Sequence, residues 1–196
     1  MLRTAVLGIA VGAAVLVYFS LALYFVPQSY RMQERRPEAV VTDVSISEEE
    51  ITLGQSFVIS VSGTNRGEDA DMQIVSVGFP NLTRIDSNVE LVDHNFDQTP
   101  MIINAGQNVG SAYGGTSVTV PAQHASIEAF SRPWRGGTNY SIDLRVEPPM
   151  EGRFVIFVKS VAFPHSWDGA HWPAEGTVDY QQEFVEVYDV LVTKNP

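Results

Sequence analysis

The first 26 residues and the rest of the chain follow two different patterns of hydrophobic and polar positions. Residues 5–26 run for 22 residues without a charged side chain. A helix rises about 1.5 Å per residue, so this stretch is long enough to cross a hydrocarbon core of about 30 Å. A polar neck that contains Arg31, Arg35 and Arg36 follows it. The pattern predicts one N-terminal transmembrane helix over about residues 5–26, within an anchor and neck of residues 1–36.

A cleaved secretory signal peptide is the alternative interpretation of this segment. Such peptides have an apolar core of about 7–15 residues, followed by a cleavage site of small residues. The apolar run here is longer, and the sequence after Ser20 offers no such site. An uncleaved anchor is therefore favoured.

The orientation of the helix depends on two opposing signals. Arg3 precedes the helix and three arginines follow it, which favours a cytoplasmic location for the C-terminal part. Against this, residues 37–196 carry 22 of the 23 acidic side chains and have the strand-and-turn pattern common in extracytoplasmic modules. We expect the N-terminus inside and the C-terminal domain to be periplasmic or extracellular.

Small residues are regularly spaced within the predicted helix. Gly8 and Gly12 form a GxxxG pair, and Ala10 and Ala14 form a second pair of small residues one step round the helix. Close backbone approach at such positions is what packs helices together in lipid. The alternative is that glycine is simply common in membrane helices. If the pair is functional, the anchor packs against a helix of another membrane subunit.

From residue 37 onward, apolar and polar residues alternate with the period of two that is typical of half-buried strands. β-branched and aromatic residues dominate the runs, and Gly, Asn, Asp and Pro separate them. The predicted strands are residues 40–46, 56–62, 72–79, 117–120, 140–146, 153–161 and about 178–193. The stretch 85–115 is poor in strand signal, and we expect a long insertion or loop with short strands there.

This spacing predicts an all-β domain over residues 37–196, an immunoglobulin-like antiparallel β-sandwich, with a closed barrel as the alternative. Residues 40–79 resemble the cell-adhesion-related immunoglobulin modules of bacterial and archaeal surfaces. There a strand leads into an acidic turn, and Gly54-Gln55 opens a second strand that ends at Asn65-Arg66-Gly67. The resemblance implies a binding or spacer role and brings no catalytic residue with it.

Composition excludes several classes of protein. The chain of 196 residues has a formal net charge of −11, which argues against a nucleic-acid partner, because phosphates require a basic surface. It has no cysteine, which excludes disulfides, thiolate metal sites and cysteine nucleophiles. Neither a nucleophile elbow nor a phosphate-binding loop is present. We therefore expect no enzymatic activity and no cofactor.

Two histidines in one loop are the candidate metal ligands. His165 and His171 flank Asp168, and two imidazoles with a carboxylate suit Cu(II) or Zn(II). Their spacing matches no established ligand motif, so ordinary solvent-exposed loop histidines are the simpler interpretation.

Three tryptophans are the candidate docking residues. Trp167 and Trp172 lie in the same loop as these histidines, and Trp134 stands between Arg132 and Arg135. Aromatic residues are favoured at the centres of interfaces, and arginines can stack on them. The alternative is that these rings plug the ends of the sandwich.

Two triplets, beginning at Asn81 and Asn139, have the N-glycosylation pattern and matter only outside the cytoplasm. Taken together, the sequence favours a non-enzymatic, single-pass accessory subunit of a membrane complex, whose partners are other membrane subunits and the lipid bilayer. A copper- or zinc-handling domain of a membrane oxidase or its assembly factor is one alternative. A surface adhesion or carbohydrate-binding module is the other.

Overall fold

The computed structural model describes residues 13–21, 35–108, 120–164 and 169–194. The chain divides into two compact units, Met1–Arg35 and Arg36–Pro196. In the first unit residues 13–21 are helical, and the other residues of the predicted helix 5–26 lie outside the described ranges. Over the described part of the chain, no helix has both the length and the apolar character needed to cross a membrane.

The second unit is built of strands, which confirms the all-β expectation. The described strands are β1 (Ala39–Ile46), β2 (Glu50–Thr52), β3 (Phe57–Asn65), β4 (Met72–Phe79), β5 (Val89–His94), β6 (Met101–Ile103), β7 (Ala125–Ser131), β8 (Asn139–Val146), β9 (Gly152–Phe163), β10 (Ala170–Trp172), β11 (Thr177–Val178) and β12 (Phe184–Thr193).

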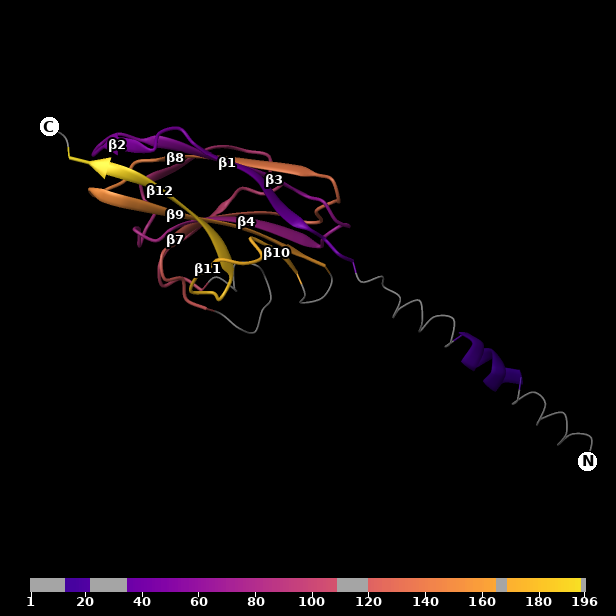
Figure 1. Ribbon diagram of the computed structural model, residues 1–196. Coiled ribbons are helices and arrows are strands. Elements are labelled where there is room, and N and C mark those ends of the chain that lie inside the picture. Colours follow the sequence, from indigo (N-terminus) through magenta and orange to yellow (C-terminus); the bar gives the residue numbers. More distant parts are fainter. Residues whose placement is uncertain (1–12, 22–34, 109–119, 165–168, 195–196) are drawn as a thin grey trace, which may run out of the picture. The chain divides into compact units, whose positions relative to one another are not determined.

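The strands form two sheets (Figure 1). The smaller sheet has the order β1-β3-β8-β5, and the larger has the order β11-β12-β9-β4-β7-β6. All neighbours on these two paths are antiparallel. The larger sheet gains β10, which pairs antiparallel with β9, and β2, which pairs parallel with β12. Two antiparallel sheets confirm the predicted β-sandwich architecture.

The core lies between the two sheets and draws on alternate residues of both. Along β3, for example, every second residue is buried, which is the period of two that predicted the strand. The rings of Phe57 on the smaller sheet and Phe154 on the larger sheet meet edge to face, with centroids 6.2 Å apart. Such contacts between the inner faces hold a sandwich together.

Strand β9 organises the larger sheet because it has three neighbours. One edge pairs with β4, while the other pairs with β12 along its first half and with β10 along its second half. The chain that joins β9 to β12 therefore returns along β9 and then forms the short β11–β12 hairpin. This connection lies against the outer face of the larger sheet, where its loop 179–183 contacts β9.

Five predicted strands coincide with described ones: 40–46 with β1, 56–62 with β3, 72–79 with β4, 140–146 with β8 and 153–161 with β9. The run predicted over 178–193 is interrupted by the loop 179–183, which separates β11 from β12. Strands β2, β5, β6, β7 and β10 were not predicted. The stretch 85–115, where a long insertion was expected, contributes β5 to the smaller sheet and β6 to the larger one, and β7 lies between β4 and β6. The predicted strand 117–120 lies almost wholly outside the described residues.

The point where the chain enters the sandwich is fixed by Asn65, whose side chain is fully buried. Its Oδ1 accepts the backbone N–H groups of Glu38, at 2.8 Å, and Gly67, at 3.1 Å. Its Nδ2 donates to the carbonyl oxygen of Glu68 at 2.7 Å. This carboxamide thus joins the residue before β1 to the loop after β3.

Candidate functional site

Charged and hydroxyl side chains form a row across the outer face of the larger sheet. In the strand register Lys159 on β9 lies opposite Ser76 on β4, and Ser76 lies opposite Glu128 on β7. Side chains alternate between faces along a strand, and the adjacent residues Val158 and Val77 belong to the core. The row therefore lies on the outside of the sandwich, beneath the chain that connects β9 to β12.

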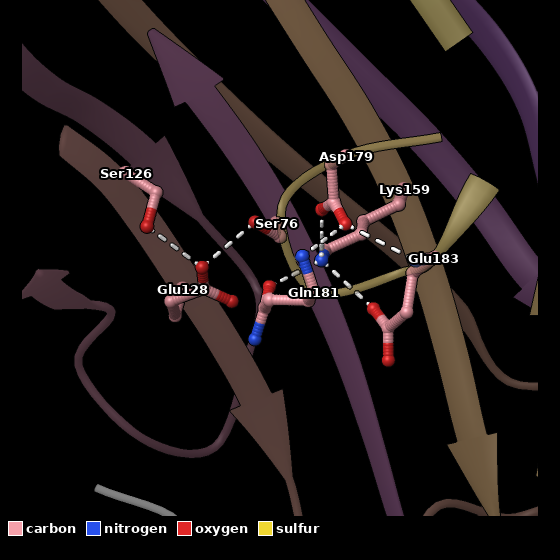
Figure 2. Close-up of polar contacts among 7 residues, drawn as sticks. All are labelled: Ser76, Ser126, Glu128, Lys159, Asp179, Gln181 and Glu183. Carbon is pink, nitrogen blue, oxygen red and sulfur yellow. Dashed lines mark hydrogen bonds and ion pairs between the residues drawn. The ribbon is translucent and has the colours of Figure 1, made fainter. Parts of the chain in front are cut away.

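The ammonium group of Lys159 is surrounded by acceptors from that connection (Figure 2). Lys159 Nζ lies 2.7 Å from Asp179 Oδ2 and 2.8 Å from Glu183 Oε2. It also donates to Gln181 Oε1 at 2.5 Å. The exposed fractions of the Lys159 and Asp179 side chains are only 9% and 3%. A buried charge requires this kind of pairing, because an isolated one is prohibitively costly to desolvate.

Asp179 also shapes the loop that brings these acceptors together. Its second oxygen, Oδ1, accepts the backbone N–H groups of Gln181, at 2.8 Å, and Glu183, at 3.1 Å. Gln182 takes a positive φ of 64°, as a tight turn demands. One carboxylate therefore folds the loop with one oxygen and holds Lys159 with the other.

Glu128 supplies the carboxylate at the other end of the row. Its Oε1 accepts the hydroxyl groups of Ser76 and Ser126, each at 2.7 Å. The residue is 4% exposed, so the hydroxyls replace the water that a carboxylate would otherwise bind. We call Ser76, Ser126, Glu128, Lys159, Asp179, Gln181 and Glu183 the Lys159 cluster.

The fields of these groups shift the pKa values of the cluster and its neighbours. Burial alone lowers the pKa of Lys159, but the negative charges of Glu183, Glu128 and Asp179 outweigh it, and the net pKa is raised. Burial, together with the Glu128 charge, raises the pKa of Tyr180 to about 12. Lys159 is thus held as a cation, and Tyr180 as a neutral phenol.

His124 closes one side of the cluster. Its ring meets those of Tyr180 and Phe157 edge to face, with centroids 5.1 and 5.7 Å away. Burial lowers its pKa, and the Lys159 charge does the same, while Asp179 partly offsets them. Gly78 leaves the room for this ring, because a Cβ there would lie 2.8 Å from His124 Nε2.

The cavity among these residues is too small for a substrate. Its volume is about 10 Å³, and a single water needs about 10–15 Å³ on this measure. The residues of the Lys159 cluster other than Glu183 line it together with His124 and Tyr180. With its charges already paired and no further room, the cluster is suited to fasten the β9–β12 connection onto the sheet.

The candidate docking residues have different surroundings. Trp134 is 3% exposed and packs with Phe96 and Tyr140, and its Nε1 donates to the carbonyl oxygen of Thr138 at 3.2 Å. For Trp134 the burial favours the alternative in which the ring plugs the sandwich. Trp172 is half-buried on β10 and packs against the core. Trp167 lies outside the described residues.

The candidate metal and helix-packing residues are only partly described. His171 is exposed on β10, while His165 lies outside the described residues, as do Gly8 and Gly12. Within the described ranges, no three His, Asp or Glu side chains gather in an arrangement that could hold a metal ion. The expectation that His165 and His171 share a site therefore stays a prediction.

The Lys159 cluster was not predicted from the sequence. The available signal was one charged residue, Lys159, inside the run Phe154–Ala162, which is apolar apart from Lys159 and Ser160. A lysine is almost never buried without a partner, so that position called for a carboxylate nearby. The partner is Asp179 because the chain after β9 turns back along β9. A pattern of apolar and polar residues does not predict the path of such a connection.

No protein-family model matches the chain, and no curated protein matches it. Solved structures resemble it in architecture. A cohesin module from a Clostridium perfringens family 33 glycoside hydrolase aligns with 82% of this chain and 99% of its own length, at 8% identity and a TM-score of 0.39. A collagen-binding domain from a Staphylococcus aureus adhesin aligns with 79% of this chain and 96% of its own, at 10% identity and a TM-score of 0.36. Both TM-scores are below 0.5, so the function has to be inferred from this chain's own residues.

Proposed function

We propose that this chain is a non-enzymatic, single-pass membrane protein that carries its β-sandwich on the extracytoplasmic side, as an accessory subunit of a larger membrane complex. The observation that carries the proposal is the uncharged stretch of 22 residues, 5–26, followed by an arginine-bearing neck. A segment of this length and composition is suited to span a bilayer.

The geometry of the sandwich supports a binding rather than a catalytic role. Its largest described group of buried charges, the Lys159 cluster, is paired internally and encloses a cavity of only about 10 Å³. A catalytic site needs a nucleophile, acid or base that faces space for a substrate. The cluster instead secures a surface connection, as a stable recognition domain requires.

The predicted helix, residues 5–26, is the first candidate for contact with a partner subunit. Gly8 and Gly12 would allow a neighbouring helix to approach closely, and lipid cannot replace such packing. In the domain, Trp167 and Trp172 stay the candidate docking residues, whereas the burial of Trp134 favours a role in the core.

Membrane partition and extraction test the proposal. The full chain and a fragment of residues 36–196 are expressed in parallel, and membranes are washed at alkaline pH. We expect the full chain to stay in the pellet until detergent is added, and the fragment to be soluble. Gentle detergent extraction from the native membrane should then release the full chain together with other membrane subunits.

Two results would contradict parts of the proposal separately. Release of the full chain by the alkaline wash would overturn the anchor. A detergent-solubilised chain that migrates alone would overturn the accessory role and favour the adhesion alternative, which a glycan-binding assay with the same protein then tests.

A further inference from the structure

The two glycosylation triplets of the chain have opposite structural surroundings. Asn81-Leu82-Thr83 lies in the turn after β4, and Asn139-Tyr140-Ser141 begins β8. Sugar transfer to such a triplet modifies the carboxamide nitrogen of the asparagine, and the bulky product must lie on the surface. The question is which carboxamide the folded domain leaves available.

The side chain of Asn81 is used inside the larger sheet. Its Oδ1 accepts the backbone N–H of Val155 at 2.7 Å, and its Nδ2 donates to the carbonyl oxygen of Arg153 at 3.4 Å. The next residue, Leu82, is 4% exposed. A sugar on Asn81 Nδ2 would lie against the backbone of β9 and oppose the packing of the turn.

The side chain of Asn139 is exposed, and among the described residues its carboxamide makes no hydrogen bond. The backbone around it is nevertheless fixed. Its carbonyl oxygen accepts from Asn95 Nδ2 at 3.2 Å, and the N–H of Ser141 donates to Asn95 Oδ1 at 2.9 Å. The acceptor nitrogen is therefore free on a rigid strand.

The strand also places both functional residues of the triplet on one face. Asn139 and Ser141 are two residues apart, whereas Tyr140 between them points into the core and is 1% exposed. On the adjacent strand β3, Thr64 lies opposite Asn139, and Ser62 lies opposite Ser141. Small, half-exposed polar side chains thus surround the site, and a sugar can rest on them without covering an apolar surface.

We propose that Asn139 is an N-glycosylation site of this protein and that Asn81 is not. The donor is an oligosaccharide activated on a lipid diphosphate. The Asn139 nitrogen forms a bond to the first carbon of the sugar, the bond from that carbon to the phosphate oxygen breaks, the nitrogen loses one proton, and the lipid diphosphate leaves. The inference rests on the proposed function in one respect, because donor and transferase face the extracytoplasmic side.

Translation of the full chain in the presence of microsomes, which hold donor and transferase in their lumen, tests the proposal. We expect the chain to gain one glycan that an endoglycosidase removes. Asn139→Gln and Ser141→Ala should each lose it, while Asn81→Gln and Ser141→Thr should keep it. Peptide mass spectrometry identifies the modified asparagine.

A fifth variant separates failure of the site from failure of the topology. Glu175 precedes Gly176 and Thr177 in an exposed loop, so Glu175→Asn creates a new triplet on the surface. Modification of Glu175→Asn in the Asn139→Gln background, together with an unmodified wild type, would overturn the Asn139 site and leave the orientation supported. If no variant is modified, the proposed extracytoplasmic orientation is wrong, and Asn139 is then not a glycosylation site either. A glycan on Asn81 would also overturn the proposal.

Discussion

Lys159 and Asp179 are separated by twenty residues of chain, yet Lys159 Nζ and Asp179 Oδ2 lie 2.7 Å apart with both side chains almost fully buried. Lys159 belongs to the middle of the larger sheet, and Asp179 to the loop just before its last strand. Their pairing ties the β9–β12 connection to the sheet it covers. The strength of that tie can be measured.

Replacement of Lys159 by Met should strongly destabilise the domain. The substitution leaves the carboxylates of Asp179 and Glu183 without their cation, and removal of one partner of a buried pair typically costs about 3–5 kcal/mol. Urea unfolding of the fragment 36–196 measures the loss. A reduced midpoint with an unchanged slope is expected.

Arg153→Met is the matched control for this experiment. Arg153 lies on the same outer face of β9, and its guanidinium group is 2.6 Å from Asp189, but the two side chains are 67% and 37% exposed. Exposed pairs contribute little because water and salt screen them. Equal losses in the two variants would mean that the buried Lys159 pair has no special importance for stability.

The pKa of His124 predicts a loss of stability at mildly acidic pH. Burial lowers this pKa below its ordinary value of 6.5, so the unfolded chain binds a proton more readily than the folded one. The contribution of His124 is therefore fully present above pH 6.5 and is lost as the pH falls through the folded pKa. His124→Phe keeps the aromatic contacts with Tyr180 and Phe157 but cannot titrate. Unfolding measured from pH 7.5 downward should show a shallower decline in this variant, and parallel curves would contradict the prediction.

Gly63→Ala should be among the most damaging small substitutions in the smaller sheet. A Cβ at this position would lie 2.1 Å from the Tyr140 hydroxyl and 2.3 Å from the carbonyl oxygen of Val40, and that oxygen belongs to the backbone. Overpacking of this kind costs about 1–3 kcal/mol, and we expect the upper end because two groups must move. Thermal unfolding checks it against Ser62→Ala, which changes the outward-facing neighbour and should leave the melting temperature nearly unchanged.

The proposed anchor, residues 5–26, leads to a prediction about assembly. If the chain is the proposed accessory subunit, replacement of both Gly8 and Gly12 by Leu should release it from its membrane partners while it stays in the membrane. Leucine side chains would separate the packed backbones, but leucine is more favourable than glycine within a bilayer. Co-purification after gentle detergent extraction measures the association. Recovery of partner subunits at the wild-type level would show that these glycines are ordinary membrane composition.

Strand prediction depended on residue type as well as on alternation, because β4 is buried along almost its whole length and was predicted, whereas β7 was missed. Strand β3 alternates between buried and half-buried residues, and its pattern was clear from the sequence. Strand β7 is buried along its whole length. It pairs with β4 on one edge and β6 on the other, one of its faces contributes to the core, and the outward side chains Ser126 and Glu128 belong to the buried Lys159 cluster. Its residues Ala125, Ser126 and Glu128 have low strand propensity, so neither alternation nor composition marked it.

The Lys159 cluster was beyond sequence prediction for a different reason. Ser76 and Glu128 meet because β4 and β7 are neighbours in the sheet, although 52 residues separate them. Such pairs depend on which strands are neighbours and in which register they pair, and the alternation of residues along one strand does not determine either. The buried Trp134 shows the same limit, because an arginine-flanked tryptophan has one sequence pattern whether it docks a partner or closes the core.

The Asn65 carboxamide has a mechanical consequence. A pulling force applied to the chain before Arg36 enters the domain at β1, which among the described strands pairs with β3 alone and does so from Ala39 onward. An edge ladder pulled from its end opens one pair after another, so its resistance depends mainly on the first step. The bond from the Glu38 N–H to Asn65 stands at that step, beside the bonds that join Arg36 to Glu68 and Glu38 to Arg66, and these must break before the ladder can open. Force on the chain before β1 would thus be resisted first by this small group of bonds around the buried Asn65 carboxamide, before any β1–β3 pair opens.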